Sequence, residues 1–305
     1  MRNSTGVLTS LDWALANDDF LLMTDNAGRT AFDVACLHSF HAAAEQLSLG
    51  RMGCPPQPVA ASVSAHDDDC TFDSIDAHTL TARDFIANFL VPGRPLLIRG
   101  ALTDPGTREP FPFFDPESWS LDAIKASPWG RLPVAMGEIP YAASFGSRST
   151  TVSLAAACDF FSKLAKNKEN TRQYVFESIP LDSEVTRGFS IPTAGLHPSV
   201  TGFRPQKVQL SLGAAGSGAP LHFHSAAVNL LIRGAKRWSL VPPSAAHYSS
   251  IHPAEMSDAA DENLRPLKCL QRTGDVIFVP DQWAHQVLNL EESVGFAAEV
   301  GERNW

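Results

Sequence analysis

The sequence predicts a mainly β fold, a sandwich or barrel with a few helices laid outside its sheets. After Phe72, short apolar segments rich in β-branched and aromatic residues alternate with Gly and Pro. Segments of this length that end in turn residues are typical of strands. Many short strands with few helices indicate a sandwich or barrel. The strand-like segments are RPLLIRG, RLPVAMG, QKVQLSLG, AVNLLIRG, KRWSLVPP, GDVIFVP and VGFAAEVG, and the helix-like stretches are TARDFIANFL and TVSLAAACDFFSKLAKN.

Length and composition bound the number of domains and the kinds of partner. The chain has 305 residues, of which 44% are hydrophobic and 19% charged, enough for one large core with a small appendage. Its formal net charge is -9, and no concentrated run of Lys and Arg offsets it. The attraction to phosphate on which nucleic-acid binders depend is therefore missing, and we expect no nucleic-acid partner.

The start of the chain and its cysteines predict an intracellular protein. MRNSTGVLTSLDWALANDDF lacks the basic and apolar regions of a signal peptide, and no window reaches the roughly 18 apolar residues of a membrane span. The five cysteines are scattered and form no CxxC pair, which favours free thiols in a reducing compartment. We expect a soluble cytoplasmic or nuclear protein with no membrane partner.

Residues 1–52 are predicted to form a small helical segment. Apolar residues recur at helical spacing on both sides of a break. The stretch DNAGRTAFDVA resembles the turn and first helix of an ankyrin repeat, in which Gly28 supplies the turn and Thr30 caps the helix. A plain helical hairpin is the alternative. Because so short a piece cannot bury a core alone, this ankyrin-like segment packs on the barrel or on a protein partner, or is a remnant.

Residues 53–72 have the composition of a linker. The stretch GCPPQPVAASVSAHDDDC is rich in Pro, Ser and small residues and ends in an acidic run. That run is expected to stay exposed, because consecutive side chains cannot all point at one ion. The barrel is then expected over residues 73–305.

Three histidines carry the candidate chemistry. GSGAPLHFH places His222 and His224 at positions i and i+2, which on a strand face the same side. In GDVIFVPDQWAHQVLN, His285 follows a strand-like run and a turn that contains Pro280. A neighbouring antiparallel strand would bring His285 to the same point, so we predict that the three residues form one metal site.

The histidine segments also carry a family resemblance. They resemble the paired cupin signatures, G-x5-H-x-H and G-x5-P-x4-H-x3-N, and the stretch from about Phe85 to Gly301 resembles Jumonji-C (JmjC) proteins. The resemblance implies a double-stranded β-helix, the cupin or JmjC jelly roll. It rests on the ordered series FLVPGRPLLIRGAL, GEIPYAASFG, APLHFH, GAKRWSLVPP and GDVIFVPDQWAH.

Similarity to JmjC proteins further implies an Fe(II) oxygenase that uses 2-oxoglutarate and hydroxylates a protein or a small-molecule substrate. It implies His222 and His285 as metal ligands, Lys236 as the partner of the distal carboxylate of 2-oxoglutarate, and Asn229 as the family's strand asparagine. A cation on a strand beside His222 can offset a buried dianion. The alternative for Lys236 is an ordinary exposed lysine.

The chain departs from the family pattern at His224. The usual H-x-D/E supplies one carboxylate to a two-histidine triad, and here His224 takes that position, while Ala219 stands where several relatives carry a hydroxyl. Three imidazoles also suit Zn, Ni or Cu. Two alternatives therefore accompany the oxygenase: a three-histidine cupin dioxygenase that does not use 2-oxoglutarate, and a non-catalytic metal-binding JmjC scaffold whose ankyrin-like end recruits a partner.

Overall fold

The computed structural model describes residues 70–103, 107, 116–140, 148–179, 204–255 and 266–301. The predicted ankyrin-like segment 1–52 and residues 53–69 of the predicted linker lie outside these ranges. None of the described helices combines the length and the apolarity that a membrane span requires.

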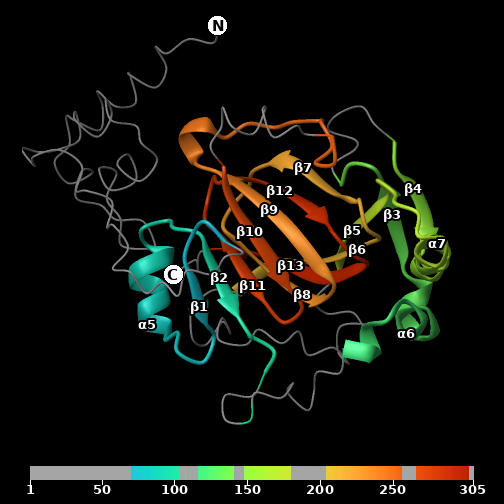
Figure 1. The fold of residues 1–305 in the computed structure, drawn as a ribbon, viewed down its shortest axis with the longest axis horizontal. Helices are drawn as coiled ribbons and strands as arrows, with labels where there is room; N and C mark the ends of the chain where they lie inside the picture. The colour runs from blue at the N-terminus through green and yellow to red at the C-terminus, as the bar shows by residue number, and fades with distance from the viewer. Residues whose placement is uncertain are drawn as a thin grey trace, which may run out of the picture.

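Strands make up most of the described chain and form two sheets (Figure 1). The larger sheet has nine strands in the order β1-β2-β11-β8-β13-β6-β5-β3-β4, and the smaller has four in the order β10-β9-β12-β7. Figure 1 shows the smaller sheet crossing in front of β8, β11 and β13. The strands are β1 (Ser74–Asp76), β2 (Leu96–Arg99), β3 (Pro133–Gly137), β4 (Thr150–Ser153), β5 (Tyr174–Ile179), β6 (Arg204–Gly213), β7 (Gly218–His222), β8 (Ala227–Arg233), β9 (Ala235–Val241), β10 (Leu267–Arg272), β11 (Val276–Val279), β12 (Ala284–Asn289) and β13 (Ser293–Gly301).

The helices lie at the outside of the larger sheet, α6 and α7 beside β3 and β4, and α5 beside β1 and β2 (Figure 1). Each of the longer helices begins at a serine whose hydroxyl accepts a backbone N–H: Ser120 Oγ from Ala123 at 3.3 Å and Ser153 Oγ from Ala156 at 3.2 Å. The helices are α5 (Ala82–Phe85), the π-helical turn η1 (Ile86–Leu90), η2 (Pro116–Trp119), α6 (Leu121–Ala126), η3 (Pro128–Arg131), α7 (Leu154–Asn167) and η5 (Pro243–Ala245).

The central strands of the larger sheet bury both of their faces. Leu96 and Ile98 on β2 belong to the large core that includes the helices, whereas Leu97 between them belongs to a second core with Trp238 and Val287 of the smaller sheet. Successive side chains of a strand point to opposite faces. Both faces are therefore apolar, which explains why these strands read as continuous hydrophobic runs rather than as an alternating pattern.

One part of the space between the sheets is polar instead of apolar. On β6, Leu210 and Leu212 face the large core, while the intervening Gln209 and Ser211 are buried on the other side. Asn229 on β8 is likewise buried and lines the same interior space as Gln209. Buried polar side chains at alternate positions of apolar strands indicate an internal site rather than a packing core.

The predicted mainly β architecture is confirmed, with differences in detail. All seven strand-like segments contain strands, and both helix-like stretches contain helices. The second helix begins at Leu154, whereas the sequence predicted a start at Thr151, because Thr150–Ser153 pair with β3 as strand β4. The short strands β1, β4, β5 and β10 and helix α6 have weak apolar patterns and were not predicted.

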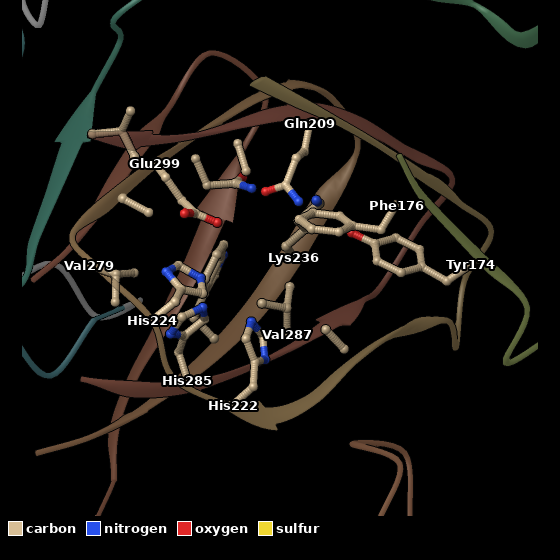
Figure 2. A pocket seen from close by; sticks show the side chains of 16 residues that line it. Tyr174, Phe176, Gln209, His222, His224, Lys236, Val279, His285, Val287 and Glu299 are labelled. Carbon is tan, nitrogen blue, oxygen red and sulfur yellow. The ribbon is translucent and has the colours of Figure 1, made fainter. Parts of the chain in front are cut away.

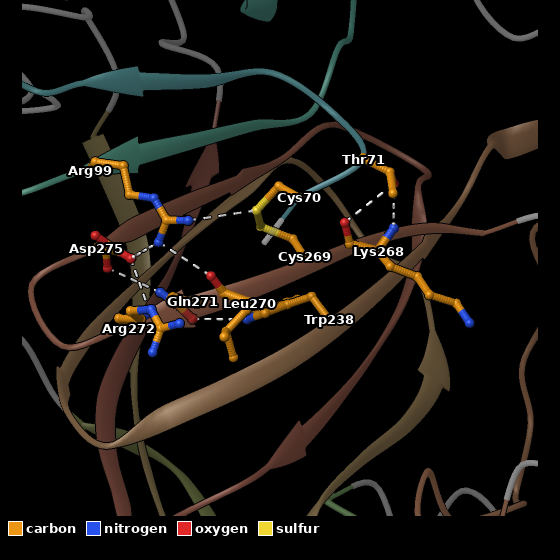
Figure 3. The surroundings of a disulfide bond; sticks show 10 residues. All are labelled: Cys70, Thr71, Arg99, Trp238, Lys268, Cys269, Leu270, Gln271, Arg272 and Asp275. Atoms are coloured by element: carbon orange, nitrogen blue, oxygen red, sulfur yellow. Dashed lines mark hydrogen bonds and ion pairs between the residues drawn. A yellow bond between two sulfur atoms is a disulfide. The ribbon is translucent and has the colours of Figure 1, made fainter. Parts of the chain in front are cut away.

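A disulfide joins the beginning of the described chain to strand β10 (Figure 3). Cys70 bonds to Cys269, 199 residues further along the chain. Beside it, Thr71 N donates to Lys268 O at 2.8 Å, and Lys268 N donates to Thr71 Oγ1 at 2.7 Å. Residues 70 and 71, the end of the predicted linker, are therefore fastened to the smaller sheet.

The expectation of free thiols is wrong for Cys70 and Cys269. Scattered spacing gives no information about which cysteines the fold brings together, and here an isolated antiparallel bridge places the two side by side. Cys158, in α7, is a buried free thiol, and burial raises its pKa to about 12. Because disulfides persist mainly in oxidising compartments, the cysteines no longer favour a reducing one.

A partly buried ion pair lies next to the disulfide and joins β2 to the turn before β11 (Figure 3). The Arg99 guanidinium contacts the Asp275 carboxylate at 2.5 Å, and that carboxylate also accepts the backbone N–H groups of Arg272 at 2.9 Å and Gly100 at 3.3 Å. Burial raises the pKa of Asp275, and these hydrogen bonds and the arginine oppose the rise. With its charge satisfied from several sides, Asp275 can be tolerated inside the fold.

Reducing the disulfide is expected to destabilise the protein by about 2–4 kcal/mol, because a long loop is released in the unfolded chain. Denaturant unfolding of the untreated protein and of the double variant Cys70→Ser/Cys269→Ser measures the difference. Adding reductant to the double variant serves as the control and is expected to change nothing. If thiol titration of the denatured, unreduced protein finds all five cysteines free, the disulfide is not formed.

Candidate metal centre

The three predicted histidines meet between strands β7 and β12 (Figure 2). His222 is the last residue of β7 and lies directly opposite His285 in the antiparallel pairing of the two strands. Their ring centroids are 4.2 Å apart, and the ring of His224, just beyond the end of β7, lies 5.5 Å from His222 and 4.9 Å from His285. Each residue offers one nitrogen, and these nitrogens all lie within 4.8 Å of one another.

The local backbone holds the strands and the histidines in this arrangement. Gly218 on β7 packs so tightly that a Cβ atom there would lie 2.0 Å from the carbonyl oxygen of Val287 on β12. The turn before β12 contains Gln282, whose positive φ of 61° allows its N–H to donate to the carbonyl oxygen of His224 at 3.0 Å. The turn that precedes His285 is thus hydrogen-bonded to His224, the second histidine of the HxH motif.

Hydrogen bonds determine which nitrogen of each ring can bind a metal. Nδ1 of His222 lies 2.7 Å from the carbonyl oxygen of Pro220, and Nδ1 of His224 lies 2.7 Å from that of Ser225. Nδ1 of His285 lies 3.1 Å from the carbonyl oxygen of Trp283. A carbonyl only accepts, so each Nδ1 carries the proton and each Nε2 presents a lone pair. Backbone carbonyls commonly orient metal-binding histidines in this way.

The charge state of the rings also suits a metal. Burial lowers the pKa of His222 to about 3. Burial, and then the charges of His222 and His224, lower the pKa of His285 well below its usual value. Both rings are therefore neutral at physiological pH, which is the form that binds metals. Three imidazoles gathered at one point fit Fe(II), Zn, Ni or Cu.

The histidines line a cavity whose walls come from strands of both sheets. Its walls are mainly apolar, with Val279, Val287, Ala297 and Trp238 among them. The Trp238 ring lies 5.9 Å from that of His285. Ala219, which was expected near the co-substrate, also lines this cavity.

Lys236 is buried deep in the same cavity (Figure 2). Only 1% of its surface is exposed, and its Nζ donates to Ser211 Oγ at 3.0 Å. Among the residues that the structure describes, no carboxylate forms a salt bridge with it. Burial consequently lowers the pKa of Lys236 to about 7. Its neighbour Arg237 is exposed, as the alternation of a strand predicts.

Asn229 is the other residue that the sequence assigned to co-substrate binding. It lies on β8, is 7% exposed and lines the cavity with Lys236. Its side-chain oxygen Oδ1 is buried and accepts no hydrogen bond from any residue that the structure describes. A buried acceptor without a donor is costly, so a ligand or water that donates to Asn229 would be stabilised here.

Sequence reasoning missed four polar residues around this cavity. Tyr174 on β5 and Gln209 and Glu299 line it, and Ser211 bonds to Lys236. The Nζ atom of Lys236 lies 6.0 Å from the centroid of the Tyr174 ring, and burial raises the pKa of Tyr174. The alternation of Gln209 and Ser211 with leucines in QLSL was the available signal.

The comparison with known families agrees with this architecture. A family model described as a cupin-like domain matches residues 82–299. The chain belongs to the cupin-like domain family. Its fold is therefore that of a cupin-like protein.

Curated relatives of this cupin-like chain carry JmjC domains. It is 27% identical to arginine-specific demethylase JMJ22 of Arabidopsis thaliana over 255 residues. This alignment covers 74% of this chain and 45% of the relative. It is 34% identical over 121 residues to JmjC domain-containing protein 8 of Homo sapiens, covering 38% and 44%. It is 31% identical over 111 residues to 2-oxoglutarate and iron-dependent oxygenase JMJD4 of Danio rerio, covering 31% and 25%. The chain spans less than half the length of these relatives.

Replacing Lys236 with methionine is expected to stabilise the ligand-free protein by a few kcal/mol at pH 7. The folded protein holds this lysine at a pKa near 7, whereas the unfolded chain keeps a pKa near 10.5 and binds more protons between these values. The free-energy cost of burying the Lys236 ammonium is therefore fully present below about pH 7 and disappears as the pH rises toward about 10.5. The stabilisation of Lys236→Met relative to the parent should shrink over the same range.

Denaturant unfolding between pH 6 and pH 10 measures this dependence. Lys163→Met is the matched control, because Lys163 is exposed on α7, and its unfolding free energy should change little at any pH. If Lys236→Met is less stable than the parent at every pH, the desolvation cost of the buried ammonium is offset by interactions in the folded protein, and the expectation is wrong.

Proposed function

We propose that this protein is a metal-dependent oxygenase that binds 2-oxoglutarate in the cavity between its sheets. The observation that carries the proposal is Lys236, a buried cation that forms no salt bridge with described carboxylates and shares one cavity with three converging imidazoles. The relatives support it, since one is named as a 2-oxoglutarate and iron-dependent oxygenase. Another is named as an arginine-specific demethylase, which favours a protein substrate over a small molecule.

The metal would be held by the Nε2 atoms of His222, His224 and His285. We propose Fe(II), with Zn, Ni and Cu as ions that the same donors accept. Bound Fe(II) supplies the activation of dioxygen by which oxygenases of this kind oxidise a C–H bond. The protein's part is to keep His222 and His285 neutral through burial and to orient all three rings through their backbone carbonyl partners. Its apolar walls keep water away.

Lys236 would bind the distal carboxylate of 2-oxoglutarate. A dicarboxylate that enters this cavity loses much of its hydration, so a carboxylate without a cation would cost several kcal/mol. Ser211 already orients the Lys236 amine at 3.0 Å. The unpaired Oδ1 of Asn229 cannot accept from a carboxylate, and so we propose that Asn229 contributes through its amide N–H groups after rotation or through a bound water.

His224 favours one alternative, a three-histidine dioxygenase that binds its substrate on the metal and ignores 2-oxoglutarate. An imidazole at this position is a neutral ligand, so the ligand set carries one negative charge fewer than that of the usual H-x-D/E motif. In that alternative Lys236 meets a carboxylate of the substrate itself. The two functions differ in one measurable property, the binding and decarboxylation of 2-oxoglutarate.

Binding of 2-oxoglutarate is expected to be accompanied by proton uptake. A bound carboxylate raises the pKa of Lys236 from about 7, so above pH 7 the amine takes up a proton and the affinity falls as the pH rises. Calorimetric titration of the metal-loaded protein in buffers of different ionisation enthalpy measures the uptake. Lys236→Met should weaken binding by about 2–5 kcal/mol, roughly 30-fold or more, without changing the metal content.

Lys163→Met again serves as the control, and succinate formation from 2-oxoglutarate reports turnover. Equal affinity of the parent and of Lys236→Met would remove 2-oxoglutarate from the function and favour the three-histidine dioxygenase. Retention of the metal by variants with alanine at His222 and His285 would contradict the metal site itself.

Replacing His224 with aspartate tests the departure from the family pattern. The change restores the carboxylate of the H-x-D/E motif, and we expect tighter Fe(II) binding with equal or faster decarboxylation of 2-oxoglutarate. Chelator competition measures the affinity, and succinate release measures the rate. Loss of turnover in His224→Asp, with the metal still bound, would mean that three imidazoles are the working ligand set.

A further inference from the structure

Glu299 is an acidic residue whose side chain enters the cavity from the last strand. On β13, Ala297 and Glu299 line the cavity, whereas Phe296 and Ala298 face the large core on the opposite side. Figure 2 shows the Glu299 carboxylate directed into the cavity on the side of His224. It stands beside Ala227 of β8, whose short side chain leaves room for it.

The backbone is irregular next to this residue. The pairing of β13 with β6 shifts register directly after Glu299. Such irregularities re-aim side chains and are common next to active sites.

Among the residues whose side chains the structure describes, Glu299 makes no hydrogen bond and no salt bridge. Although Lys236 lines the same cavity, the two form no ion pair. In the pairing of β13 with β6, Glu299 lies opposite Lys207. Glu299 is only partly exposed, and a carboxylate that loses part of its hydration is stabilised by a nearby cation, such as an ion held by the three histidines.

We propose that Glu299 supplies the negative charge that the HxH motif lacks, by binding the metal that the three histidines hold. The inference rests on the proposed metal site. The Glu299 oxygens lie outside the group of nitrogens that are all within 4.8 Å of one another, so the side chain reaches the ion by rotating about its own torsions or through one water. Glutamate oxygens are ordinary ligands of Fe(II) and Zn and complete sites made of imidazoles.

Charge balance gives the reason for such a residue. A divalent metal and the Lys236 ammonium together carry one positive charge more than 2-oxoglutarate carries negative. An aspartate or glutamate at position 224 would cancel that excess in the usual family pattern. In this chain Glu299 cancels it from a different strand.

Cobalt binding tests the assignment without reference to activity. Glu299→Gln should lower the Co(II) affinity of the protein by about 10–100-fold and shift the visible absorption bands of bound Co(II), because an anionic oxygen donor is lost. Glu291→Gln removes the same charge from the exposed turn before β13 and should leave affinity and spectrum unchanged. The thermal midpoint of each ligand-free variant, and the variant Glu299→Asp with an expected intermediate loss, separate this effect from misfolding.

The double variant His224→Asp/Glu299→Gln provides the sharper test. If Glu299 replaces the missing carboxylate, aspartate at position 224 should restore most of the Co(II) affinity lost in Glu299→Gln, whereas a general electrostatic or structural role predicts that the loss persists. Affinity within twofold of the parent in Glu299→Gln, together with loss of cobalt in His222→Ala and His285→Ala, would overturn the role of Glu299 and leave the metal site standing. Cobalt binding that survives the histidine variants would overturn the metal site of the proposed function as well.

Discussion

The antiparallel pairing of β7 with β12 is the contact on which the candidate site depends. It places His285 opposite His222, and it is possible at this distance because Gly218 has no side chain to meet the Val287 carbonyl. Backbone carbonyls then hold each Nδ1, which leaves each Nε2 as the nitrogen able to bind an ion. Strand pairing thus brings the rings together, and the carbonyl groups set their orientation and tautomer.

The cavity beside β7 and β12 contains polar groups whose burial is unfavourable without a ligand and favourable when a ligand is bound. Within the part of the chain that the structure describes, the Lys236 ammonium has only the Ser211 hydroxyl as hydrogen-bond partner, and the side-chain oxygen of Asn229 accepts no hydrogen bond. Two imidazoles are held neutral by burial. Each of these arrangements costs free energy that an apolar core would save. A bound cation and a bound dicarboxylate would compensate these costs, which is the physical reason to regard the cavity as a binding site.

The smaller sheet connects this site to the disulfide. Cys269 on β10 pairs in register with Trp238 on β9, and the Trp238 ring lies near His285. Gln271 accepts from the Trp238 indole at 2.8 Å and donates to the Asn229 carbonyl at 2.9 Å, so β10 positions residues of both sheets. The covalent bond from Cys70 therefore restrains a strand whose neighbours line the cavity, and it favours an oxidising environment over the reducing one that the cysteine spacing suggested.

The sequence by itself determined the fold class and the identity of the three histidines. Apolar runs, the turn residues that bound them and the i, i+2 spacing of two histidines are local properties of the sequence. Such local patterns are the main signal for secondary structure, so they predict strands directly. Tertiary structure alone decided which distant residues meet: Cys70 with Cys269, Ser211 with Lys236, and Glu299 with the cavity of the histidines. Strand register decides those contacts, and register depends on how both sheets pack. The sequence of one strand does not show which strand it pairs with or in which register.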